Sequence, residues 1–160
     1  MKDKLFFKLI GWHFIITFFS ILILSLILEK NVGSKMIYFS AFLFTLLLYG
    51  LNGYFLTETK HRWFSYSGIA CIGIVLWIIS YILSPDTTHY KQVGSAGFWF
   101  LHELYIIGTS PLHLIPLNDY SLKMDLFQKF ISPILFSASQ LIGGLIKMKK
   151  IVRHGLQPNL

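Results

Sequence analysis

Six side chains that could bind a metal or transfer a proton lie in one segment of the sequence, residues 87–129. Imidazole and carboxylate groups are ligands for zinc, and the same groups serve as general acids and bases. The segment therefore carries the residue types for either kind of chemistry. Its three histidines and three carboxylates are His89, His102, Glu103, His113, Asp119 and Asp125.

Glu103 is the strongest candidate for acid–base catalysis, with His102 and His113 as its partners. Its neighbours in the sequence are mostly large apolar residues, and burial among such residues favours the protonated form of a carboxyl group. A carboxyl group that keeps its proton is a reasonable general acid. A site of this kind would suit proton transfer at a lipid headgroup.

A metal site is the weaker interpretation of the same segment. Its ligands would be His89, His102 and His113, but their spacing matches neither H-x-x-x-H nor H-E-x-x-H, as zinc motifs would require. Histidine is also an ordinary residue at membrane interfaces, where its apolar body and polar tip suit the boundary. We therefore expect no metal and no cofactor.

Four long apolar runs must position this segment, and they cover residues 9–28, 36–56, 63–84 and 130–146. A helix needs about 20 apolar residues to cross a bilayer. The chain is 54% hydrophobic and only 13% charged, with a mean hydropathy of +0.62, whereas soluble domains are about 25% charged. The sequence predicts an all-α integral membrane protein, a single domain over residues 1–160 built as an antiparallel bundle of four transmembrane helices.

The charged residues sort unequally between the two faces that these four spans would create. One face collects nine basic and two acidic residues, and the other collects five of each, so the first carries the whole net charge of +7. Cytoplasmic loops are rich in Lys and Arg, which predicts that both termini are cytoplasmic. The richness in Ile, Phe, Lys and Leu further suggests a bacterial cell membrane. The nine basic residues are Lys2, Lys4, Lys8, Lys60, Arg62, Lys147, Lys149, Lys150 and Arg153.

Residues 97–117 are as apolar as a span but are not predicted to cross. A fifth crossing would move the basic C-terminal residues to the other face and break the charge asymmetry. Pro111, Pro116 and the ionisable Glu103 would also make a poor span. We expect residues 96–108 to form a helix that lies in or dips into the outer leaflet, and residues 109–118 to return; a full crossing is the alternative.

Polar residues inside the runs recur at helical spacing. His13, Thr17 and Ser20 share one helix face, and Thr45, Tyr49 and Asn52 share another. We expect both faces to turn toward the other helices, because lipid offers polar groups no partner. The strongly polar residues at membrane depth are His13, Asn52 and Gln140. Such residues are functional candidates by default, and the alternative is that they form hydrogen bonds between helices.

Small residues predict where helices approach closely. Gly50 and Gly53 lie beside Asn52, and Ser139 and Gly143 form a small-x-x-x-small pair in the last run. Pro133 is expected in the first turn of that last helix, where proline is tolerated. The lone cysteine, residue 71, is expected to be buried at helical depth.

No motif in the chain names a reaction. Nucleophile elbows, phosphate-binding loops and dinucleotide fingerprints are absent from the sequence, and the basic residues flank spans instead of forming a nucleic-acid-binding face. We therefore expect a non-enzymatic accessory, immunity or regulatory module that binds membrane lipids, a membrane-protein partner or a second copy of itself, and no nucleic acid.

Two alternatives stay open. One is an enzyme that modifies lipids in the outer leaflet, using the Glu103, His102 and His113 group. The other is a subunit of a small-solute transporter, whose pathway would be lined by polar residues of three spans. Those lining residues would be Thr17, Thr45, Tyr49, Asn52 and Gln140.

Overall fold

The computed structural model describes residues 4–29, 35–57, 63–84, 93–109 and 122–153. Within these ranges the chain is entirely helical, with five α-helices, two short 3-10 helices and no strand. Four helical stretches are long and apolar enough to cross a membrane. In chain order the elements are α1 (Lys4–Glu29), α2 (Lys35–Leu56), η1 (Trp63–Ser67), α3 (Gly68–Leu83), α4 (Val93–Ile106), η2 (Ile107–Thr109) and α6 (Leu122–Arg153).

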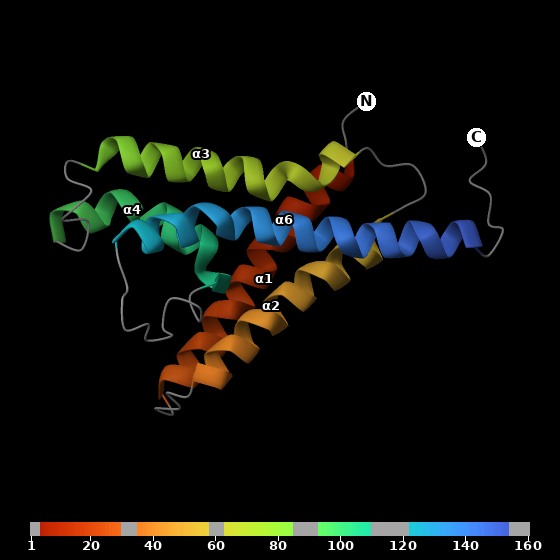
Figure 1. The fold of residues 1–160 in the computed structure, drawn as a ribbon, viewed down its shortest axis with the longest axis horizontal. Helices are drawn as coiled ribbons and strands as arrows, with labels where there is room; N and C mark the ends of the chain where they lie inside the picture. The colour runs from red at the N-terminus through yellow and green to blue at the C-terminus, as the bar shows by residue number, and fades with distance from the viewer. Residues whose placement is uncertain (1–3, 30–34, 58–62, 85–92, 110–121, 154–160) are drawn as a thin grey trace.

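The long helices form two groups that meet at one end of the molecule and diverge toward the other (Figure 1). The antiparallel pair α1 and α2 forms one group, and α3 and α6 form the other. At the meeting end α1 and α3 begin, while α2 and α6 end. We call this the basic end, because Lys4 and Lys8 begin α1 there and the last residues of α6 include Lys147, Lys149 and Arg153.

Helix α4 and its continuation η2 fill the space between the two groups. Helix α4 runs antiparallel to α3, because Trp99 packs edge-on against Trp77 and Tyr105 reaches back to Ile69. Gly108 of η2 lies between the two helices of the first pair: a Cβ added there would lie 3.0 Å from Thr45 Cγ2. Helix α4 and η2 therefore occupy the space where the two groups of long helices diverge (Figure 1).

The helix expected over residues 96–108 is present, spanning Val93–Ile106 and ending in η2. At 1.5 Å per residue its 14 residues extend about 21 Å, short of the roughly 30 Å hydrocarbon core. It is not among the candidate spans found in the described residues. The expected return over residues 109–118 lies almost wholly outside the described residues.

Helix α6 is much longer than the apolar run that predicted it. The run covers residues 130–146, whereas the helix covers Leu122–Arg153. Hydropathy marks the apolar section of a helix, but charged residues such as Asp125 and Lys150 continue the helical backbone without difficulty. Pro133 therefore lies inside the helix and not in its first turn; Gly73 of α3 leaves room for its ring, since a Cβ there would overlap the proline ring atoms.

Helices α2 and α6 approach closely through the predicted small residues. A Cβ added at Gly53 would lie 2.7 Å from the carbonyl carbon of Gln140, and one at Gly143 would lie 2.8 Å from that of Gly50. The Ser139 hydroxyl donates a hydrogen bond to the Leu46 carbonyl oxygen over 2.6 Å. The prediction of a tight crossing at these residues is therefore confirmed.

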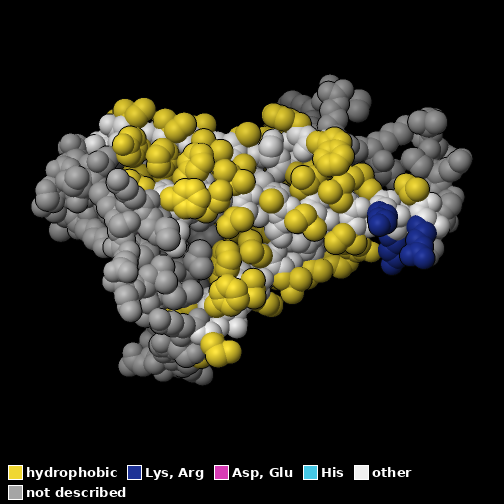
Figure 2. Space-filling view, in the orientation of Figure 1, with side chains coloured by type: hydrophobic (Ala, Val, Ile, Leu, Met, Phe, Trp, Pro, Cys, Tyr) yellow, Lys and Arg dark blue, Asp and Glu magenta, His cyan; other side chains and the backbone are white. Residues whose placement is uncertain are grey.

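The outside of the long helices is covered by large apolar side chains (Figure 2). Phe14 of α1, Phe44 of α2 and Ile78 of α3 are among many that are exposed. Such a continuous apolar surface is unfavourable in water and is typical of a membrane or protein interface. Cys71 also lies on this exterior, so the expectation that it is buried was wrong.

Candidate functional site

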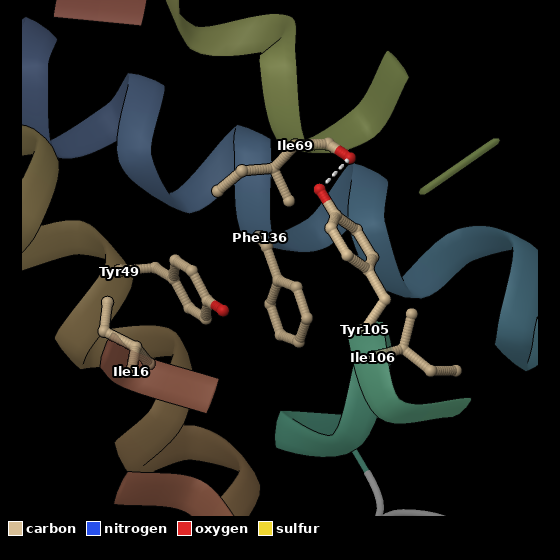
Figure 3. Close-up of a cluster of buried hydrophobic side chains, with 6 residues drawn as sticks. All are labelled: Ile16, Tyr49, Ile69, Tyr105, Ile106 and Phe136. Carbon is tan, nitrogen blue, oxygen red and sulfur yellow. Dashed lines mark hydrogen bonds between the residues drawn. The ribbon is translucent and has the colours of Figure 1, made fainter. Parts of the chain in front are cut away.

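The inner end of α4 is anchored in the main buried cluster of the protein (Figure 3). The cluster contains Ile16, Tyr49, Ile69, Tyr105, Ile106 and Phe136, from five different elements. The Tyr105 hydroxyl donates a hydrogen bond of 3.0 Å to the carbonyl oxygen of Ile69. Helix α4 is therefore held at its tip by both packing and a buried hydrogen bond.

His13 joins three helices at this point. Its Nδ1 atom lies 2.7 Å from the Tyr49 hydroxyl, and its ring centroid is 4.2 Å from that of Tyr105. The Tyr49 ring in turn stacks on Phe136 with centroids 4.3 Å apart. His13 is fully buried, so this candidate from the sequence acts within the described structure as an interhelical hydrogen-bonding group.

An ion cluster ties α4 to the first turns of α6. Lys129 Nζ lies 2.5 Å from Glu103 Oε1 and 2.9 Å from Asp125 Oδ2. The Lys129 and Asp125 side chains are only 4% and 7% exposed, whereas that of Glu103 is 42% exposed. The Lys129 ammonium also lies 5.2 Å from the centroid of the Trp99 ring, a cation–π distance.

The structure describes two of the three residues of the Glu103 site predicted from the sequence, Glu103 and His102. The Glu103 carboxylate is engaged by Lys129, and His102 is fully buried with its ring edge-on to Trp99 at 5.8 Å. His113, the third predicted partner, lies outside the described residues.

The described residues contain no group of three or more His, Cys, Asp or Glu side chains placed to hold a metal ion. Of the three weak metal candidates, only His102 falls within these residues. His89, His113 and Asp119 lie outside the described residues.

The polar residues predicted to turn inward all do so. His13, Thr17 and Ser20 of α1 are buried, and so are Thr45, Tyr49 and Asn52 of α2 and Gln140 of α6. Within the described part of the chain, neither the Asn52 nor the Gln140 side-chain amide has a hydrogen-bond partner. Buried amides normally bind a protein group or an ordered water, so this interior has unused donors and acceptors.

One face of α4 remains exposed while the opposite face is buried. Phe100, Leu101 and Leu104 are all exposed, the first two by 61% and 64%, and their spacing places them on one side of the helix. The half-exposed Glu103 borders them. The result is an apolar ridge next to a carboxylate, on a helix fixed at its inner end.

Sequence reasoning missed Lys129, Trp99 and Tyr105 as positioning residues of this site, and it named Asp125 only as a possible metal ligand or acid–base group. One signal was available: Asp125 and Lys129 are four residues apart, the spacing of an ion pair on a helix. Residues 122–129 precede the apolar run of residues 130–146, so hydropathy alone does not predict that they are helical.

Comparison with known proteins places no further constraint on this site: no protein-family model, curated protein or solved structure matches the chain.

Proposed function

We propose that this chain is an integral membrane protein whose four long helices span the bilayer, with the basic end in the cytoplasm. The four candidate spans support this by length and composition. Their alternating directions bring the start of α1 and the end of α6 to the same end of the molecule (Figure 1), where the basic residues gather. That end matches the cytoplasmic bias of Lys and Arg. In this orientation α4 enters from the outer side and stops within the membrane.

Cysteine labelling tests this topology. In a Cys71→Ala background, an Asp86→Cys variant should react with a membrane-impermeant maleimide in intact cells. A Lys150→Cys variant should react only after the membrane is permeabilised. The opposite pattern would contradict the orientation, and equal labelling of both in intact cells would contradict the membrane placement.

We propose further that the protein is a non-enzymatic accessory, immunity or regulatory module, and that α4 is its recognition element. This proposal is supported by the difference between the two sides of α4. One side is held by contacts with other helices, and the other side is exposed. Tyr105 and the ion cluster hold the helix, while Phe100, Leu101 and Leu104 are exposed. A rigid helix with an apolar ridge is a common means of binding a lipid or a membrane partner.

Site-specific photo-crosslinking tests the role of α4. A benzophenone amino acid at Phe100 should give a discrete adduct with one protein, one lipid class or a second copy of the chain. The matched control at Phe44, which is exposed on α2, should label bulk lipid only. The Leu101→Ser/Leu104→Ser variant should lose the adduct and still insert. Identical patterns at Phe100 and Phe44 would refute a recognition role.

The lipid-modifying alternative has less support from the described geometry. An acid–base group would need Glu103 to face a histidine or a substrate, but its carboxylate contacts Lys129. A Glu103→Gln variant separates the two functions. The recognition role predicts that this variant keeps its Phe100 adduct, whereas an enzyme would lose turnover of its lipid substrate.

A transporter subunit remains a second candidate, because one observation favours it. The five residues predicted to line a pathway, Thr17, Thr45, Tyr49, Asn52 and Gln140, are all buried in the interior. The Asn52 and Gln140 amides have no partner among the described residues, which suits transient contact with a polar solute. Solute flux into reconstituted liposomes tests this, and Asn52→Leu/Gln140→Leu should abolish it. Absence of flux for a panel of small polar solutes would refute it.

A further inference from the structure

The basic residues in the last two turns of α6 differ in whether they contact another helix. Lys147 is engaged: its Nζ donates to the carbonyl oxygen of Phe55 over 3.2 Å and lies 5.9 Å from the Tyr54 ring. It therefore ties α6 to the end of α2. Lys149, Lys150 and Arg153 are exposed.

These three basic residues form no ion pair with an acidic residue in the part of the chain that the structure describes. The sequence contains no acidic residue after Asp125. Unpaired cations so close together repel one another. A bound anion would relieve that repulsion.

The three cations share a helix face with Ile146. The intervals of three, four and seven residues from Ile146 to Lys149, Lys150 and Arg153 place all four on one side of α6. They line a hollow of about 350 Å³, near the lower end of the range for small-molecule sites. Figure 2 shows the blue cationic patch next to apolar surface at the basic end.

The same face turns apolar one turn further into the helix. Ile142 lies four residues before Ile146, and both are largely exposed. The face therefore changes within about one turn from exposed isoleucine to exposed lysine and arginine. That order matches an anionic phospholipid, whose acyl chains would lie against the isoleucines and whose phosphate would meet the cations.

We propose that this face of α6, from Ile142 to Arg153, is a binding site for an anionic phospholipid of the cytoplasmic leaflet. Lys and Arg near such a surface each strengthen binding by roughly fivefold, and phosphate oxygens accept their charge-assisted hydrogen bonds. The apolar surface at Ile142 and Ile146 favours a lipid over free phosphate as the ligand, because a lipid has acyl chains to place there and free phosphate has none. The proposal rests on the membrane placement proposed above.

Lipid binding to the full-length protein in a neutral detergent, measured by native mass spectrometry, tests the proposal. Phosphatidylglycerol should bind at least tenfold more tightly than phosphatidylcholine with the same acyl chains. The Lys149→Gln/Arg153→Gln variant should lose about 25-fold in affinity for phosphatidylglycerol, from the roughly fivefold per residue. The matched Lys4→Gln/Lys8→Gln variant removes two positive charges from the same end of the molecule and should lose less than threefold.

Each contrary result has a defined meaning. Equal losses in the two variants, or no preference for phosphatidylglycerol, would overturn the site. Release of the lipid by millimolar inorganic phosphate would assign the cations to free phosphate instead. Helix content must stay unchanged by circular dichroism, because basic residues also balance the partial negative charge at a helix end. Extraction of the protein from membranes by alkaline carbonate would contradict the membrane placement, whereas retention without headgroup preference contradicts only the lipid site.

Discussion

The close crossing of α2 and α6 predicts that alanine is not tolerated at Gly53 or Gly143. In either variant the new methyl group would meet backbone of the facing helix: 2.7 Å from the Gln140 carbonyl carbon in one case and 2.8 Å from that of Gly50 in the other. Ordinary contact begins at 3.4 Å. A side chain could rotate away from such an overlap, but backbone cannot, so the two helices must separate.

The separation of α2 and α6 determines how much each variant lowers the free energy of unfolding. Overpacking a tight contact typically costs 1–3 kcal/mol, and the backbone obstacle places these two variants at about 3 kcal/mol each. Moving the helices apart also lengthens the 2.6 Å bond from Ser139 to the Leu46 carbonyl, which adds about 0.6 kcal/mol in a membrane protein. Alanine is a better helix former than glycine, which stabilises each variant by only about 0.5–1 kcal/mol.

The matched control is Gly11→Ala on the exposed side of α1, where an added Cβ has nothing within 4 Å. That variant should be neutral or more stable by up to about 1 kcal/mol, from helix propensity alone. The assay is unfolding of the protein in mixed micelles by increasing SDS, followed by circular dichroism. If Gly53→Ala and Gly143→Ala unfold like Gly11→Ala, the argument that these glycines allow backbone contact is refuted.

Four further substitutions test the contacts around α4 and α3 in the same unfolding assay. Tyr49→Phe removes the hydroxyl that bonds His13 Nδ1 and should destabilise the protein by about 1–2 kcal/mol; a change below the error of the assay would show that this bond is not stabilising. Lys129→Met leaves the buried Asp125 carboxylate without its cation and should lower the free energy of unfolding by about 3–5 kcal/mol. Glu103→Gln, at the more exposed end of the cluster, should lower it by less than about 1 kcal/mol. The reverse order would contradict the assigned burial. Cys71→Ala, on the exposed face of α3, should stay within about 0.5 kcal/mol of the parent protein, and a larger loss would place this side chain in a contact.

Much of the helical framework could be predicted from local pattern. The apolar runs located all four long helices, because the length of a run and its hydropathy are properties of the sequence alone. The inward faces, such as that of His13 and Thr17, followed from helical periodicity, and both residues are buried. The crossing at Gly53 and Gly143 followed from residue size, since only small side chains let two backbones approach.

The candidate site was predicted less well, for a physical reason. The sequence predicted His102 as the partner of Glu103, because the two residues are adjacent in the chain. In the structure Glu103 forms a salt bridge with Lys129, 26 positions further along the chain. A salt bridge between elements depends on how two helices are placed, and no local pattern contains that placement. Hydropathy also hid the first turns of α6, because charged residues such as Asp125 interrupt an apolar run without interrupting a helix.

The sequence by itself therefore determined where the four long apolar helical stretches lie and which of their faces are buried, since these depend on each residue's own chemistry and on helical spacing. Only the tertiary structure decided that α4 enters between the diverging helix pairs, that its tip bonds Ile69 through Tyr105, and that its ridge at Phe100 and Leu101 stays exposed. Those features depend on the shape of the space left between packed helices, which emerges only when all of them are in place.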